Sequence, residues 1–157
     1  RELGGDGDVP HASLLPAKRF DASGRPLGEA LVETLRNHTP KCIVVDELAD
    51  AAAAKAASIV GERGVALVAT AHARSLAELV DDAAMAPVLG DFETVTLSDS
   101  EARRRNYEHG QGLRKVRRQR VRNATFGAVV ELAPGPAGEW VVVHDVNAAV
   151  DAIVDGA

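Results

Sequence analysis

The sequence has few cysteines and aromatic residues, and it has no long apolar run. Cys42 is the single cysteine among 157 residues, which excludes an intrachain disulfide framework and a zinc site built from several cysteines. Aromatic residues make up only 3% of the chain. No apolar stretch approaches the roughly 20 residues that a membrane-spanning helix requires. The chain therefore belongs to neither the disulfide-stapled nor the helical membrane class of protein.

The composition that is present suits a folded domain with an uneven charge distribution. Hydrophobic residues make up 46% of the sequence, and the formal net charge is −5. Residues 103–122 contain nine basic residues and one acidic residue, a net charge of +8, which leaves nine basic against 22 acidic residues, or −13, elsewhere. Such asymmetry favours an anionic partner for the basic segment. Because the chain starts at Arg1 without an initiator methionine, we expect a piece of a longer polypeptide.

Strands and helices are predicted to alternate in the first half. Residues 42–45 and 65–72 are short apolar runs, which are typical of strands buried on both faces of a parallel sheet. Helical spacing is found in residues 29–38, and an alanine-rich helix is predicted over residues 48–62. Ser75 and Glu78 form a capping-box pattern before a further helix. This order predicts an α/β fold with right-handed crossovers.

The second half is predicted to contain shorter elements. Residues 92–97 alternate loosely and predict a strand, and residues 114–122 of the basic segment are expected as either helix or strand. Residues 125–132 and 140–144 predict a β-hairpin with a loop, and Trp140 is expected to pack in the core or at the sheet edge. A last helix is predicted over residues 146–154, capped by Asp145.

Polar side chains follow the two predicted parallel strands. Asp46 and Glu47 end the first strand, while Thr70 and His72 end the second. Ligands of open parallel sheets bind beyond the carboxyl ends of strands, so these side chains are candidates for a site. An aspartate there can hold Mg²⁺ through its water shell, and the adjacent glutamate can act as a general base. The alternative is structural: acidic residues that cap the next helix and a histidine that caps a turn.

The basic segment has two interpretations as well. Clustered basic side chains are an electrostatic footprint for phosphate backbones, so nucleic acid is a candidate partner. The alternative is a solvated surface stretch, or one that contacts acidic patches of a neighbouring subunit. The candidate nucleic-acid residues are Arg114, Lys115, Arg117, Arg118, Arg120 and Arg122.

Several short motifs occur in one order over nearly the whole chain. They are Gly5-Asp6-Gly7-Asp8-Val9-Pro10-His11, Val44-Val45-Asp46-Glu47, Glu62-Arg63-Gly64-Val65, Ala69-Thr70-Ala71-His72 and Glu101-Ala102-Arg103-Arg104-Arg105. With residues 94–99 and 126–132, this series resembles a family of RecA-like P-loop ATPases of cyanobacteria and plastids, which is similar to stage III sporulation protein AA and to secretion and pilus-retraction ATPases.

The resemblance implies a fold, cofactors and partners. Residues 1–100 would form part of a RecA-like P-loop NTPase sheet flanked by helices, and residues 101–157 would pack the basic segment, a hairpin and a terminal helix on it. ATP and Mg²⁺ would be the cofactors, and the chain would assemble into a homo-oligomeric ring. Its location would be the cytoplasm or the chloroplast stroma.

The resemblance also implies roles for single residues. Asp46 and Glu47 match the Walker B pair, with Asp46 as the Mg²⁺ ligand. His72, following Thr70, matches a histidine box. Glu2 matches the acidic box in which related motors place a catalytic carboxylate. Lys18 and Arg19 fall where the family carries a basic cluster, and one of them, here taken as Arg19, would act in trans as an arginine finger in the ring.

The loop that holds phosphates is missing from this sequence. The pattern G-x-x-x-x-G-K-[ST] does not occur, and in the resembled family it lies upstream of the first residue here. We therefore expect this chain to be the C-terminal portion of an oligomeric ATPase that acts on a nucleic acid or a protein. The whole protein would be an enzyme only if the phosphate-binding loop precedes Arg1. The alternative is a non-catalytic scaffold or nucleic-acid-binding module derived from such an ATPase.

Overall fold

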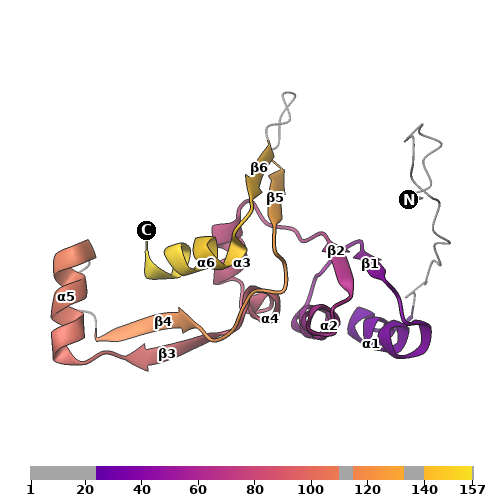
Figure 1. Ribbon diagram of the computed structural model, residues 1–157, viewed down its shortest axis with the longest axis horizontal. Coiled ribbons are helices and arrows are strands. Elements are labelled where there is room, and N and C mark those ends of the chain that lie inside the picture. Colours follow the sequence, from indigo (N-terminus) through magenta and orange to yellow (C-terminus); the bar gives the residue numbers. More distant parts are fainter. Residues whose placement is uncertain (1–23, 110–114, 133–139, 157) are drawn as a thin grey trace.

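The structure is a computed structural model that describes residues 24–109, 115–132 and 140–156. In these residues helices and strands are mixed, and the sheets are small. The described strands form three separate two-stranded sheets, β1–β2, β3–β4 and β5–β6. Figure 1 shows them along an elongated molecule, with helices α2, α4 and α6 in its middle. The predicted mixed α/β class is confirmed, whereas a RecA-like sheet is not found in the described part of the chain.

The first sheet is covered by helices on one face. Strands β1 (Cys42–Val45) and β2 (Ala66–Ala69) pair in parallel, with Val45 opposite Ala69. Helices α1 (Leu27–His38) and α2 (Ala51–Glu62) lie side by side below them (Figure 1). The prediction that these strands are buried on both faces is wrong, because Val44 and Val68 on the other face are 58% and 57% exposed.

Small side chains allow α1 and α2 to pack closely. A Cβ at Gly28 would lie 2.8 Å from the carbonyl oxygen of Ala52, so only glycine allows this approach. The Asp50 side chain caps α2 by accepting a hydrogen bond from the amide of Ala53 at 2.8 Å. This cap sets the start of the helix immediately after the polar segment that follows β1.

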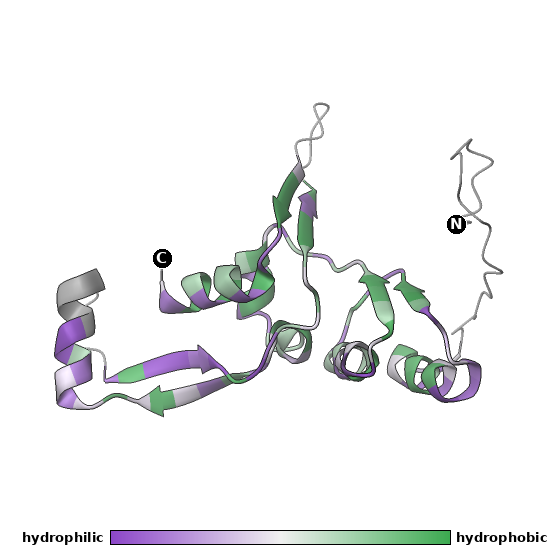
Figure 2. Cartoon of the chain, in the orientation of Figure 1, coloured by the Kyte–Doolittle hydropathy of each residue, from purple (hydrophilic) through white to green (hydrophobic). Residues whose placement is uncertain are grey.

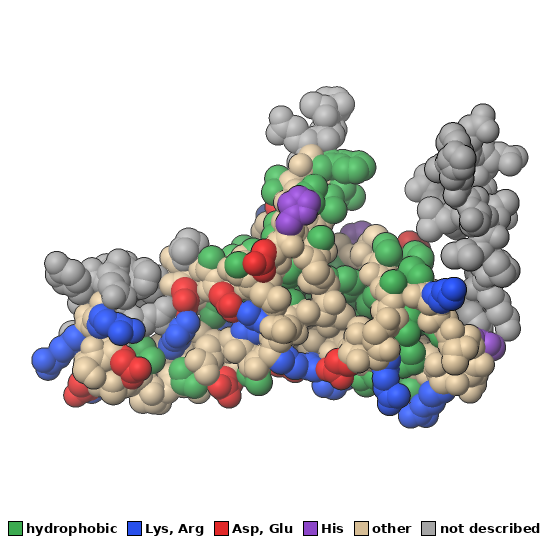
Figure 3. All heavy atoms as spheres, viewed as in Figure 1, with side chains coloured by type: hydrophobic (Ala, Val, Ile, Leu, Met, Phe, Trp, Pro, Cys, Tyr) green, Lys and Arg blue, Asp and Glu red, His purple; other side chains and the backbone are tan. Residues whose placement is uncertain are grey.

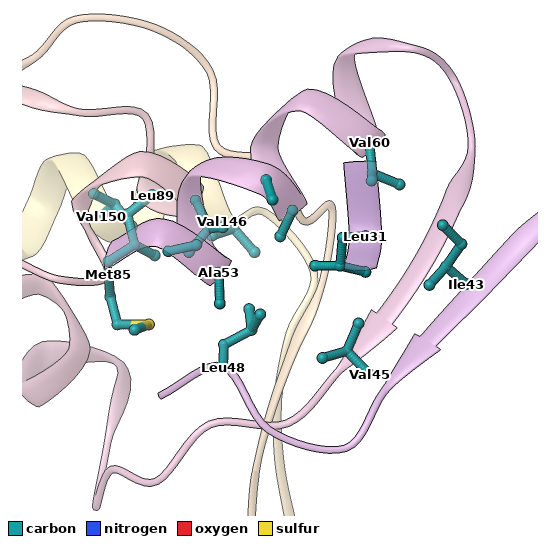
Figure 4. Close-up of a cluster of buried hydrophobic side chains, with 14 of the residues drawn as sticks. Leu31, Ile43, Val45, Leu48, Ala53, Val60, Met85, Leu89, Val146 and Val150 are labelled. Atoms are coloured by element: carbon teal, nitrogen blue, oxygen red, sulfur yellow. The ribbon is translucent and has the colours of Figure 1, made fainter. Parts of the chain in front are cut away.

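The buried core runs from this sheet to the C-terminal helix. Figure 4 shows Leu31, Val45 and Val60 near the first sheet, and Met85 and Val150 at the other end of the same cluster. Helices α3 (Leu76–Asp81), α4 (Ala86–Leu89) and α6 (Val146–Asp155) supply the second part of the core. Segments distant in sequence therefore share one continuous apolar core.

The remaining elements extend away from this core. Strands β3 (Phe92–Thr96) and β4 (Val116–Arg120) form an antiparallel ribbon, and helix α5 (Asp99–His109) lies at its far end (Figure 1). Strands β5 (Val129–Leu132) and β6 (Trp140–Val143) form an antiparallel hairpin that projects from the body. Of the two alternatives for the basic segment, the structure has a strand over residues 116–120. Helix α5 was not predicted from the sequence.

The start of α5 carries a capping box that depends on pH. Ser98 donates its hydroxyl to Glu101 at 2.7 Å, and the amide of Glu101 donates to the Ser98 oxygen at 3.3 Å. The side-chain hydrogen bond from Ser98, with the backbone one, lowers the pKa of the Glu101 carboxyl. A carboxyl with a lowered folded-state pKa stabilises the fold above its unfolded pKa, and this stabilisation is lost as pH falls through the folded value.

We expect the first turn of α5 to be well protected near neutral pH and to open at acidic pH. Amide hydrogen exchange at residues 98–102, followed by NMR across the acidic range, measures this change. Glu101→Gln is the control, because glutamine keeps the capping geometry without titrating. Equal pH dependence in the variant and the parent chain would assign the opening to another group.

Candidate functional site

The predicted polar residues meet at the carboxyl edge of the β1–β2 sheet. Asp46 and Glu47 follow β1, and Thr70 and His72 follow β2, because the parallel register brings both strand ends to the same edge. The Thr70 hydroxyl donates a hydrogen bond to the Asp46 carbonyl. The Leu48 amide donates to the Thr70 carbonyl at 2.8 Å. The two polar segments are therefore joined to each other by these hydrogen bonds.

The ionisable groups at this edge are open to solvent. His72 Nε2 lies 3.8 Å from Glu47 Oε2, and their side chains are 89% and 49% exposed. An ion pair so exposed contributes at most about 1 kcal/mol to stability. Across the described ranges, no group of three or more His, Cys, Asp or Glu side chains could hold a metal ion. Mg²⁺ and ATP at this edge stay predictions, as do the roles of the residues there.

Three other predicted site residues lie outside the described residues: Glu2, Arg19 and Arg114.

The basic residues of the ribbon contact acidic and apolar groups of the same chain. Arg117 binds Asp155 through two hydrogen bonds of 3.0 Å. Arg120 binds Asp151 in the same bidentate manner, at 2.9 and 2.7 Å. Asp151 and Asp155 are one helical turn apart on α6, so two arginines of β4 fasten the ribbon to one face of that helix.

The other basic residues between positions 115 and 122 have partners as well. Arg118 donates to the Val80 carbonyl at 2.9 Å, and its guanidinium lies 3.9 Å from the centre of the Phe92 ring. Arg122 pairs with Glu62 and, at 2.7 Å, with Asp91. Lys115 lies 2.8 Å from Asp99. The acidic partners thus belong to the same chain, which neither interpretation of the segment anticipated. Any phosphate group would compete with these partners, and nucleic-acid binding stays a prediction.

A hollow of about 470 Å³ lies between β4 and α6. Its lining includes Arg117, Arg120, Asp151 and Asp155, which pair with one another as described above. Because its basic groups already have carboxylate partners, the hollow presents little net attraction to an anion.

The hairpin exposes the largest apolar side chains of the described surface. Leu132 and Trp140 are opposite each other in the register, and they are 67% and 69% exposed. Val130, Val141 and Val142 are also exposed. Figure 2 shows both strands of the hairpin as mainly hydrophobic, and Figure 3 shows an apolar surface on the projecting hairpin. Of the two expected positions for Trp140, the core is wrong, because the side chain is exposed; the residue lies at the sheet edge, on a strand of a two-stranded sheet.

The base of the hairpin is held firmly. Val129 and Val143 pack partly buried against the core. The Glu131 carboxylate accepts a hydrogen bond of 2.6 Å from the amide of Leu76, at the start of α3. The packed base and the Glu131 contact with α3 therefore orient the hairpin, while Leu132 and Trp140 at its outer end remain exposed. The sequence signal for this surface is the run Trp140–Val143, four strand-forming residues without a charge.

Comparison with known proteins finds relatives along the whole chain. The chain is 34% identical over 156 residues to the uncharacterized protein ycf45 of Porphyra purpurea, and 35% identical over the same length to the protein SEEDLING PLASTID DEVELOPMENT 1 of Arabidopsis thaliana. It is 30% identical to the protein ycf45 of Cyanidium caldarium. These alignments cover 99% of this chain, which spans 26%, 22% and 44% of the relatives' lengths, respectively. No family model and no solved structure matches the chain.

These relatives correct the predicted identity and function. They are ycf45 proteins and a protein named for plastid development, and none of their names describes a RecA-like P-loop ATPase. The assignment to that family, and with it the ATPase function, is therefore wrong by this comparison. The alternative of a P-loop-derived scaffold or nucleic-acid module finds no support either. The structure agrees on the fold, since the described strands form separate two-stranded sheets instead of a RecA-like sheet.

Two broader expectations, on plastid association and on membrane-spanning helices, agree with the findings. The plastid association agrees with the name of the Arabidopsis relative. In the described residues, no helix has the length and apolar character needed to cross a membrane.

Proposed function

We propose that this chain is an assembly module of a plastid-associated protein, and that the β5–β6 hairpin binds another polypeptide. The exposed Leu132–Trp140 pair at the outer end of the hairpin carries this proposal. The plastid association rests on the name of the Arabidopsis relative, and we place the module in the chloroplast stroma.

The chemistry of the hairpin suits protein binding. Tryptophan is among the residues that most often dominate interface energies, and burying apolar surface contributes about 25 cal/mol per Å². Apolar residues occupy both strands, and Glu131, the one charged side chain in β5 and β6, is bound to the start of α3. The exposed surface thus has apolar contacts to offer and no charge to desolvate.

The backbone of the hairpin also favours a polypeptide partner. In the described chain, β5 and β6 pair only with each other, so each has one edge open to a further strand. A bound strand would satisfy the outward amides and carbonyls of that edge by β-augmentation. A two-stranded hairpin is marginally stable alone, so an added strand also stabilises it.

Site-specific photo-crosslinking in plastid-bearing cells tests this proposal. A photoreactive residue at position 140 in the protein as the cell makes it is expected to give a discrete covalent adduct with a polypeptide in the stromal fraction. Val121 is the matched control position, because it is 56% exposed but lies outside the hairpin. Mass spectrometry identifies the adduct.

Three results would contradict the proposal. Absence of adducts at position 140, or equal yields at positions 140 and 121, would show that the hairpin binds no polypeptide. Adducts with lipid alone would assign the exposed apolar surface to membrane contact instead.

A further inference from the structure

The two edges of the hairpin differ in how well they are protected. Strand β5 carries Glu131, whose side chain holds the strand against the start of α3. Strand β6 consists of Trp140, Val141, Val142 and Val143, of which the first three are exposed. It contains no charge and no proline, two of the features that commonly prevent edge strands from pairing with other chains. The β6 edge is therefore the one that is ready to accept a strand.

An uncharged edge of this kind is complementary to itself. Two identical strands placed antiparallel are related by a two-fold axis, so each copy supplies the same surface. A two-fold axis in such a ladder passes midway between a residue and its own copy, which lie opposite each other. With the axis at Val142, Val142 of one copy is opposite Val142 of the other, and Val141 is opposite Val143. A strand of β-branched and aromatic residues suits such cross-strand pairing.

Charge also favours a second copy over a charged partner. The chain has a formal net charge of −5, which opposes self-association at long range. The exposed part of β6 contributes nothing to that repulsion, because it has no ionisable side chain. It also offers no charge that would select an acidic or a basic partner. An equally apolar and equally open edge is its best match, and β6 of another copy is such an edge.

We propose that the polypeptide bound by the hairpin is a second copy of this chain, joined through antiparallel β6–β6 pairing into a four-stranded sheet. This rests on the proposed function of the hairpin and names its partner. The four strands would lie in the order β5–β6–β6–β5, so that β5 forms the outer edge of the sheet and the open edge of β6 is closed in both copies.

Sedimentation velocity over a concentration series tests the pairing. The parent chain is expected to shift from monomer to dimer as its concentration rises. Val142→Lys places two like charges opposite each other at the two-fold axis, and the dimer is expected to be lost. Val130→Lys is the matched control, because Val130 is opposite Val142 in the register and is similarly exposed (48% and 44%) but lies on the β5 edge. This control is expected to retain the dimer.

Thermal unfolding of both variants checks that they remain folded. A parent chain that is monomeric at every concentration, or a dimer that Val130→Lys disrupts while Val142→Lys does not, would overturn the inference. The proposed function of the hairpin is tested independently of this inference. Crosslinks from position 140 to a different polypeptide, combined with a monomeric chain, would keep the hairpin as a binding surface and reject the second copy as its partner.

Discussion

Gly90→Ala is expected to destabilise the protein by about 2 to 5 kcal/mol, the largest effect of any single methyl group added to a described glycine. Gly90 ends α4 in the left-handed region, at φ 103°. An added Cβ would overlap the carbonyl oxygen of Arg122 and lie 2.8 Å from two carbons of the Arg120 side chain. The backbone of Arg122 cannot move aside freely, because its amide donates to the Gly90 carbonyl at 2.9 Å.

Chemical denaturation of the variant, with the free energy of unfolding extrapolated to water, measures this effect. Gly64→Ala is the control: Gly64 also has a positive φ, 75°, but no atom lies within 4 Å of the position of its Cβ. This control isolates the backbone cost, which is about 1 kcal/mol. Equal destabilisation by both substitutions would show that the close approach of α4 to the end of β4 has no energetic weight.

The convergence of polar residues at the β1–β2 edge could be predicted from the sequence because it follows from one rule. Parallel strands end at the same edge, so the residues after β1 and β2 had to be neighbours once both runs were identified as strands. This rule predicts where the polar residues lie, but it does not predict their distances from one another or their exposure to solvent. The 3.8 Å separation and the exposure of the Glu47–His72 pair depend on the segments that surround the edge, and no local pattern encodes them.

Exposure of the sheets could not be predicted for a related reason. An uninterrupted apolar run indicates that a strand is covered on both faces only if another element is available to cover it. Val44 and Val68 have helices on one side of their sheet and none of the described elements on the other. For Trp140 the same limitation applies, since a residue type suited to burial does not identify its partner.

Helix α5 was missed although a local signal was present. Ser98 and Glu101 repeat the capping-box spacing of Ser75 and Glu78, but a highly charged sequence follows them. Without a regular apolar face, hydrophobic periodicity gives no indication of a helix. The capping pattern was therefore the better predictor of this element.

Arg120→Met is expected to lower the free energy of unfolding by about 2 to 3 kcal/mol. The Arg120 side chain is only 12% exposed, and its hydrogen bonds to Asp151 raise the pKa of its guanidinium, so it stays charged. It also donates to the Arg122 carbonyl and to the Asn147 side chain, each at 2.7 Å. Removing the guanidinium leaves several acceptors without this donor. The lower end of the range for a buried pair applies because Asp151 is 49% exposed and can regain water.

Lys115→Met is the matched control for this substitution. It removes one basic charge from the same ribbon, but the Lys115–Asp99 pair is exposed on both sides, so the expected loss is below about 1 kcal/mol. A double-mutant cycle with Asp151→Ala separates the energy of the Arg120–Asp151 pair from the effects on the other acceptors. Similar small losses for Arg120→Met and Lys115→Met would show that the arginines of β4 are not needed to hold the ribbon on α6. A large difference would mean that part of the +8 basic segment stabilises the fold. Its arginine side chains would then serve to contact α6 instead of an anionic partner.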